Sequence, residues 1–179
     1  MPRLTAQNPE TATGKTKDLF NAVQAKLGMV PNLMRTFAAS PTTLEAYLQF
    51  SGTLGHTLDA AERELIALAV SEANGCEYCA AAHSTIGKMV GLNAEQILAA
   101  RKGTAATPRH AAIVSLALAI TESRGKISDA QFAAAKAAGI SESDVAEVVA
   151  NVALNVLTNY FNNVAQTKVD FPAAAPLTA

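Results

Sequence analysis

The sequence contains two cysteines, Cys76 and Cys79, separated by two residues, and His83 follows four residues after the second. If residues 76–90 form a helix, spacings of three and four place the two thiols and the imidazole on one face. Asn74-Gly75 is typical of the end of a preceding helix. We therefore expect Cys76 at the first turn of a new helix, where unpaired N–H groups and the helix dipole stabilise a thiolate.

A Cys-x-x-Cys pair at a helix start predicts redox chemistry. Its thiol pKa can fall well below the usual ~8.5, and the imidazole of His83 could take or hold the proton. The two sulfurs can form a disulfide with little backbone movement. A thiolate that attacks an oxidant, beside a second thiol that resolves the sulfenic acid, is the minimum equipment of a thiol peroxidase. The same pair could serve a general thiol–disulfide oxidoreductase.

Two other interpretations of the cysteines stay open. They could be inert, buried small hydrophobic residues, although burial alone does not require this pairing at a helix start. They could also bind zinc together with His83 and Glu72. Zinc usually takes four ligands, however, and the chain has no second Cys-x-x-Cys or His pair. We therefore expect neither a metal nor a cofactor.

Length and composition favour one all-helical domain spanning residues 1–179. Half of the residues are hydrophobic, and much of that content is alanine, which suits closely packed helices. With 14 basic and 15 acidic residues the net charge is −1, and no basic cluster indicates nucleic-acid binding. The apolar run Ala111–Ile120 is too short to span a membrane. Residues 1–5 lack a signal-peptide core, so a reducing, cytoplasmic setting is expected, where nearby cysteines are more often catalytic or metal-binding than structural.

Local signals for helix boundaries predict seven to nine helices. Ser40-Pro41 is typical of a helix start. Glycines or Asn-Gly pairs suited to helix ends lie at 28, 55, 74–75, 91, 103, 125 and 139. Four residue pairs have the spacing of a capping box, the last only loosely: Asp59 with Glu62, Asn93 with Gln96, Ser128 with Gln131, and Ser141 with Asp144.

The two ends of the chain differ from the helical part. Residues 1–15 are polar and rich in turn formers, and residues 171–179 are rich in Pro and Ala without a period. We expect both ends to be flexible or to dock on a neighbouring subunit. Apolar helix faces in an alanine-rich chain also predict a homo-oligomer.

Several other polar residues are assigned no catalytic role. Gly14-Lys15-Thr16 resembles the tail of a phosphate-binding loop, but the glycine that such a loop needs five residues earlier is missing. His56 and His110 match no motif and are expected to be surface or capping groups. Asn162 and Asn163 lie near the end of a long apolar helix, where we expect bonds to backbone or to a subunit neighbour.

The spacing of Glu64, Cys76, Cys79 and His83 resembles that of the alkylhydroperoxidase D group within the carboxymuconolactone decarboxylase-like superfamily. The signature of that group is a glutamate, a cysteine twelve residues later, a Cys-x-x-Cys, and a histidine four residues beyond. The resemblance is strong over residues 40–105, the core redox region. It is weaker at both ends, where Met29–Leu33 is similar to a peroxidase-related branch.

This resemblance implies an all-helical bundle, assembly into trimers or hexamers, and reduction of organic hydroperoxides. Cys79 would be the peroxidatic cysteine, Cys76 the resolving thiol and proton donor, and Glu64 with His83 a proton relay. The best-known member of the group is re-reduced through lipoyl-bearing partners. A lipoyl-bearing protein is therefore one candidate for the thiol reductant, whose identity the motif does not fix. A decarboxylase-type lyase is a weaker alternative, because opening a lactone needs no dithiol.

This chain departs from the group at one residue, and helix-dipole reasoning disagrees with the group on which thiol is more acidic. The residue before the second cysteine is a histidine in the best-studied members and is Tyr78 here. A phenol with a pKa near ~10 cannot shuttle protons at neutral pH, but it can donate a hydrogen bond to a thiolate or a peroxide oxygen. Helix-dipole reasoning alone also favours Cys76 as the more acidic thiol, whereas the resemblance assigns the attacking role to Cys79. We follow the resemblance, because a nearby relay can outweigh a dipole effect of ~0.3–1 kcal/mol.

Overall fold

The computed structural model describes residues 1–54 and 58–177. Within those ranges the chain forms nine α-helices and no strand, which confirms the predicted single all-helical domain. The helices are α1 (Gly14–Leu27), α2 (Asn32–Phe37), α3 (Pro41–Thr53), α4 (Ala60–Ala73), α5 (Glu77–Met89), α6 (Ala94–Arg101), α7 (Pro108–Ser123), α8 (Asp129–Ala137) and α9 (Glu142–Ala165).

Local capping interactions start and stop the helices where the sequence predicted. All four predicted capping boxes are formed, at the starts of α4, α6, α8 and α9, and the pair judged loose, Ser141 with Asp144, is complete. Ser40 caps α3, with Pro41 at the first helical position. The predicted stop glycines that are described all have positive φ, a conformation that costs glycine little. Gly55 and His56 lie outside the described residues.

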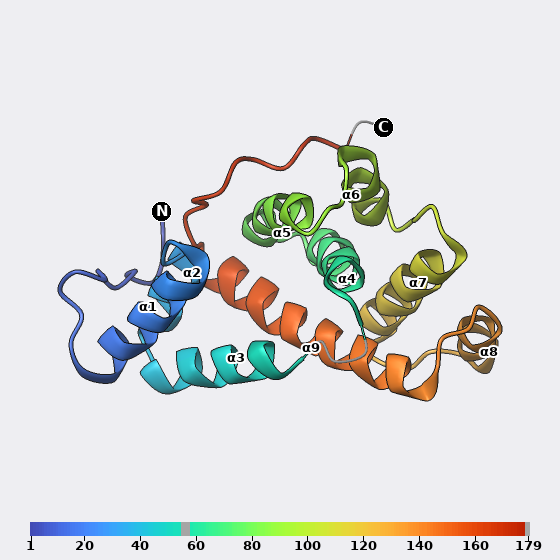
Figure 1. The fold of residues 1–179 in the computed structure, drawn as a ribbon, viewed down its shortest axis with the longest axis horizontal. Helices are drawn as coiled ribbons and strands as arrows, with labels where there is room; N and C mark the ends of the chain where they lie inside the picture. The colour runs from blue at the N-terminus through green and yellow to red at the C-terminus, as the bar shows by residue number, and fades with distance from the viewer. Residues whose placement is uncertain (55–57, 178–179) are drawn as a thin grey trace.

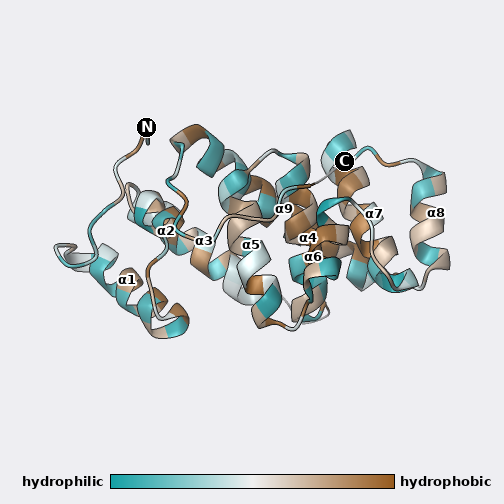
Figure 2. Ribbon diagram, turned by 90° about the horizontal axis from the view of Figure 1, so that it is seen from above, coloured by the Kyte–Doolittle hydropathy of each residue, from teal (hydrophilic) through white to brown (hydrophobic). Residues whose placement is uncertain are grey.

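The longest helix, α9, runs through the middle of the molecule and contacts helices on several sides (Figure 1). Figure 1 shows α4 and α5 on one side of it, α3 on the other, α1 and α2 near one end, and α7 and α8 near the opposite end. Eight of the 14 residues of α4 are buried, from Glu62 to Ser71, and Figure 2 shows α4 and α7 as the most hydrophobic ribbons at the centre. Helix α7 contains the predicted apolar run Ala111–Ile120. Six of the 16 residues of α7 are buried, all of them apolar and all within this run.

Both ends of the chain pack against the chain itself. The backbone N–H of Arg3 donates to the carbonyl of Ala165 at 2.8 Å. The segment after α9 passes over α5 towards α6 (Figure 1), and Asp170 there accepts a hydrogen bond from the backbone N–H of Asn32 at 2.7 Å. Docking of the ends on a neighbouring subunit stays a prediction. Residues 178–179 lie outside the described residues.

Two further sequence predictions concern a phosphate site and a membrane span. Gly14-Lys15-Thr16 forms the first turn of α1, and Lys15 makes an ion pair with Glu45 of α3. Among the described residues, no helix is both long and apolar enough to cross a membrane.

Candidate active site

The turn between α4 and α5 positions the dithiol. Gly75 has φ 58°, its N–H donates to the carbonyl of Glu72 at 3.0 Å, and the N–H of Cys76 donates to Ser71 at 2.9 Å. These two bonds form a Schellman motif, which satisfies the last carbonyls of α4 and needs a left-handed residue such as glycine. Cys76 is then the N-cap of α5, because its sulfur accepts the N–H of Cys79 at 3.4 Å. The predicted position of Cys76 at a helix start is confirmed.

The two thiols are buried and differ strongly in acidity. Both cysteines are free, and each is only 2% exposed. A hydrogen bond from the thiol of Cys76 lowers the pKa of Cys79 to about 6, against the effect of burial and with a further contribution from His83. Donating that hydrogen bond, together with burial, raises the pKa of Cys76. Helix-dipole reasoning alone, which favoured Cys76 as the more acidic thiol, is therefore wrong, because the hydrogen bond that Cys76 donates to Cys79 outweighs the dipole.

His83 and Glu64 form an ion pair, and the charge of His83 acts on Cys79. Nδ1 of His83 lies 2.7 Å from Oε2 of Glu64, and both side chains are mostly buried. Burial opposes the charged imidazole, but the carboxylate of Glu64 outweighs it and raises the pKa of His83. After the turn at Asn74-Gly75, α5 folds back on α4, and this brings Glu64 to the imidazole. The four residues of the predicted signature therefore meet in space.

Replacing Glu64 by glutamine tests the coupling between this pair and the thiolate. Without the carboxylate, the pKa of His83 falls, less positive charge faces Cys79 at neutral pH, and the pKa of Cys79 rises from about 6. We expect a rise of about one unit, the lower end of the range for a nearby charge. The pH titration of the ultraviolet thiolate absorbance measures it. Glu95→Gln, an exposed glutamate in the first turn of α6, is the control, and equal midpoints in all three proteins would refute the coupling.

Tyr78 lies between the cysteines in sequence, but its hydroxyl is engaged elsewhere. It accepts a hydrogen bond from the backbone N–H of Leu33 at 3.1 Å. Burial raises its pKa, and the ring packs edge-on against Phe171 with centroids 5.8 Å apart. These contacts tie the start of α5 to α2 and to the segment after α9. A hydrogen bond from Tyr78 to a peroxide oxygen stays a prediction.

Helix α9 adds polar contacts to Cys79 that the sequence prediction missed. Nδ2 of Asn162 donates to the sulfur of Cys79 at 3.2 Å, and Oγ1 of Thr158 lies 3.9 Å from the same sulfur. The expectation that Asn162 bonds to backbone or to another subunit is therefore wrong, whereas Asn163 does bond to the backbone carbonyl of Asn74 at 3.0 Å. The signal available in the sequence was a helical spacing of asparagines along an apolar helix, at 151, 155, 159 and 162.

Aromatic side chains from three helices pack against the thiol cluster. Phe37 stacks on Tyr47 and on Phe161, with centroid distances of 5.3 and 4.0 Å. All three belong to the same apolar cluster as Cys76 and Cys79. Burial, and then the charge of Cys79, raise the pKa of Tyr47 to about 12. The phenol of Tyr47 therefore stays protonated near the thiolate at neutral pH, and the sequence carried no signal for it.

The zinc alternative gains no support from the described part of the chain. No three His, Cys, Asp or Glu side chains there are grouped so that they could hold a metal ion. Glu72, the fourth candidate ligand, instead makes an ion pair with Arg101 at 3.0 Å.

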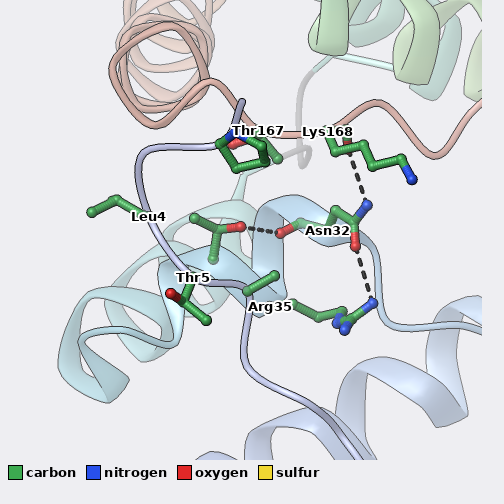
Figure 3. Close-up of a pocket in the computed structure, with 9 residues that line it drawn as sticks. Leu4, Thr5, Asn32, Arg35, Thr167 and Lys168 are labelled. Atoms are coloured by element: carbon green, nitrogen blue, oxygen red, sulfur yellow. Dashed lines mark hydrogen bonds between the residues drawn. The ribbon is translucent and has the colours of Figure 1, made fainter.

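Two surface cavities of about 420 Å³ lie away from the thiols. Figure 3 shows the first, between the N-terminal segment, α2 and the segment after α9, where Asn32, Arg35 and Lys168 contribute polar groups. The second is lined by α6, the 104–106 segment and His110. The residues lining these two cavities include no predicted catalytic residue.

The fold and the site together define an all-helical protein with a buried dithiol whose second cysteine is the acidic one. The model of the carboxymuconolactone decarboxylase family matches residues 41–122. A peroxidase-related protein from Ralstonia eutropha JMP134, described as an alkylhydroperoxidase AhpD core, is 25% identical with a TM-score of 0.85, over 94% of this chain and 92% of that chain. The family match over residues 41–122 and this likeness in fold support the predicted resemblance to the alkylhydroperoxidase D-like, carboxymuconolactone decarboxylase-like superfamily.

Two further solved structures share the fold. A peroxidase-related protein from Silicibacter sp. TM1040 has a TM-score of 0.80 at 23% identity, over 93% of this chain and 92% of that chain. The debrominase Bmp8 has a TM-score of 0.78 at 21% identity, over 94% of this chain and 92% of that chain. Among curated proteins, none matches the chain. The superfamily and the fold therefore indicate an enzyme.

Proposed function

We propose that the protein is a thiol-dependent peroxidase that reduces organic hydroperoxides through a dithiol–disulfide cycle of Cys76 and Cys79. The observation that carries this proposal is the thiol pair itself. Cys79, with a pKa of about 6, is a thiolate at neutral pH, and the thiol of Cys76 is hydrogen-bonded to it. A thiolate is the nucleophilic form of cysteine, and a second thiol within reach can resolve its oxidised product.

The cycle has three balanced steps. The sulfur of Cys79 attacks the terminal oxygen of the hydroperoxide, the O–O bond breaks, and the leaving alkoxide takes a proton from the pair of His83 and Glu64. Cys79 is then a sulfenic acid, and the substrate has become an alcohol. The sulfur of Cys76 attacks the sulfur of Cys79, water leaves, and a disulfide forms. An external dithiol, such as a lipoyl-bearing protein, returns two electrons and two protons.

Burial of the thiols supports a small organic substrate. Each cysteine is only 2% exposed, so a small molecule or a group on a long flexible arm, such as a lipoyl group, suits the site better than a disulfide fixed on the surface of a folded protein. The aromatic rings of Phe37, Tyr47 and Phe161 beside the thiols favour an apolar substituent on the peroxide. This observation favours a peroxidase over a general thiol–disulfide oxidoreductase acting on proteins. A lyase would leave the dithiol without a role.

We also propose that the protein works as a homo-oligomer, as a trimer or a hexamer. Four large apolar side chains on α9 are 42–63% exposed and recur at spacings of eight, three and four residues, so they share one side of the helix: Val149, Leu157, Tyr160 and Val164. An exposed apolar stripe of this length is typical of a surface that packs against another subunit.

Stoichiometric oxidation tests the proposed reaction. The reduced protein is mixed with one equivalent of cumene hydroperoxide, and free thiols and intact mass are followed together. We expect loss of both thiols and of two hydrogens from the protein, with release of one equivalent of the alcohol. Oxidised lipoamide and 2,3,4-tribromopyrrole, a compound found in complex with the debrominase Bmp8, are run in parallel. Thiols that survive the hydroperoxide but reduce either of the other two would overturn the peroxidase proposal.

A further inference from the structure

The side chain of Asn162 combines a contact to the reactive sulfur with an acceptor that has no use in the fold. Asn162 is 3% exposed, and its Nδ2 donates to the sulfur of Cys79 at 3.2 Å. Within the described residues its Oδ1 is fully buried and accepts no hydrogen bond. A buried polar atom of this kind costs free energy unless a ligand or water satisfies it. Since both atoms belong to one planar carboxamide, the unpaired Oδ1 is held within one amide group of the sulfur of Cys79.

The neighbouring polar groups of α9 are already satisfied. Oδ1 of Asn159 accepts a hydrogen bond from Asn74 at 2.9 Å, and its Nδ2 donates to Ser71 at 3.4 Å. The hydroxyl of Thr158 donates to the backbone carbonyl of Asn155 at 3.0 Å. Of these three side chains near Cys79, Asn162 therefore keeps an unused acceptor.

We propose that Asn162 is a catalytic residue of this site, whose amide N–H holds the thiolate of Cys79 while its Oδ1 accepts the O–H of the hydroperoxide. This inference rests on the proposed peroxidase function and adds a residue to it. The carboxamide would orient the substrate so that its terminal oxygen faces the sulfur. Residues that align the reacting atoms contribute to the rate as much as those that exchange protons.

The same O–H group persists through the reaction, which explains why one acceptor suffices. The terminal oxygen of the hydroperoxide carries the hydrogen before the attack. When the S–O bond forms and the O–O bond breaks, that oxygen stays bonded to its hydrogen and becomes the sulfenic acid of Cys79. The leaving alkoxide takes its proton from His83, not from this group. Oδ1 of Asn162 can thus accept one hydrogen bond in the substrate complex, in the transition state and in the product.

Two variants separate the donor from the acceptor. Asn162→Asp keeps the size of the side chain and an acceptor oxygen but lacks the amide N–H, and Asn162→Ala lacks both. Asn163→Ala, on the same helix but bonded to the backbone of Asn74, is the matched control. In Asn162→Ala we expect the thiolate absorbance of Cys79 to titrate about 1 to 2 units higher, as the loss of a hydrogen bond to a charged group implies. In Asn162→Asp the midpoint should rise further, because the new carboxylate also repels the thiolate. Oxidation by cumene hydroperoxide at neutral pH should slow by roughly 10- to 100-fold, and the control should match the wild type.

The role of Oδ1 as an acceptor is tested by the rate of oxidation at a pH above the raised pKa of Cys79. There Cys79 is ionised in every protein, so loss of the donor no longer limits the thiolate. If Oδ1 holds the substrate, Asn162→Ala stays slower than wild type by roughly tenfold, about the value of one hydrogen bond. Full recovery of its rate would overturn the acceptor role, and an unshifted midpoint in both variants would overturn the donor role.

A measurement on the wild type keeps the inference testable if a variant does not fold. The side-chain amide resonances of Asn162 should shift with pH in step with ionisation of Cys79, near the pKa of about 6. Amide resonances that do not shift over this pH range would contradict the hydrogen bond from Asn162 to Cys79. The titration is independent of peroxide turnover, so a protein that binds its thiolate through Asn162 but leaves cumene hydroperoxide intact would refute the proposed function alone.

Discussion

Cys79→Ser should lower the rate of hydroperoxide consumption by roughly 1,000-fold or more, because a serine hydroxyl is not ionised at neutral pH and lacks the nucleophilicity of a thiolate. Cys76→Ser should behave differently. It keeps the attacking sulfur but lacks the thiol that attacks the sulfenic acid, so the protein consumes one equivalent of peroxide and then stops.

Mass spectrometry distinguishes the two variants. After one equivalent of cumene hydroperoxide, Cys76→Ser should carry one added oxygen on Cys79, which a sulfenic-acid reagent such as dimedone traps. Cys79→Ser should keep an unmodified Cys76, because burial still raises the pKa of that thiol when its partner is absent. The reverse pattern, with oxygen on Cys76 and none on Cys79, would exchange the roles of the two cysteines and contradict the assignment.

Removing the charge of Arg109 should strongly destabilise the fold. The guanidinium at the start of α7 bridges two buried carboxylates, with Nε 2.6 Å from Glu62 and Nη2 3.0 Å from Asp144. Glu62 belongs to the capping box of α4, and Asp144 to that of α9. One side chain thus joins the starts of three helices that build the core.

We expect Arg109→Met to lower the free energy of unfolding by about 2 to 4 kcal/mol, because two nearly buried carboxylates lose their partner. The value lies below the full cost of a broken buried pair since 39% of the Arg109 side chain is exposed and solvent screens the charges. A fall in melting temperature of roughly 5 to 15 °C follows for a chain of this size. Urea unfolding measures the free energy, and Lys126→Met, in the segment between α7 and α8, is the control.

The loss of unfolding free energy in Arg109→Met should be larger at neutral pH than at acidic pH. Hydrogen bonds from Arg109, against the effect of burial, hold the pKa of Asp144 well below its usual range. A carboxylate with a lowered folded pKa stabilises the protein above its unfolded pKa of about 3.9, and this contribution is lost as the pH falls towards the folded value. The gap between wild type and Arg109→Met should therefore be larger at about pH 7 than at about pH 3. A gap that is constant over this range would show that Arg109 acts through packing alone.

The sequence by itself determined the helices and the place of the dithiol. Capping boxes such as Asp59 with Glu62, the glycine at 75 and the Pro at 41 act over three or four residues, so their effect can be derived without a fold. The same short range places Cys76, Cys79 and His83 on one helix. Their spacing from Glu64 also indicated the superfamily. The break before Cys76 then lets one helix fold back on the other.

Only the tertiary structure decided what surrounds the two thiols and how far their acidities differ. The acidity of Cys79 depends on a thiol, an imidazole and the amide of Asn162, and the last of these comes from a helix 83 residues further along the chain. Burial of both sulfurs, the aromatic rings beside them and the bridge made by Arg109 likewise arise from contacts between distant segments. Such contacts exclude water, and this strengthens the interactions between charges and the hydrogen bonds at the site. Neither effect follows from the local spacing of residues.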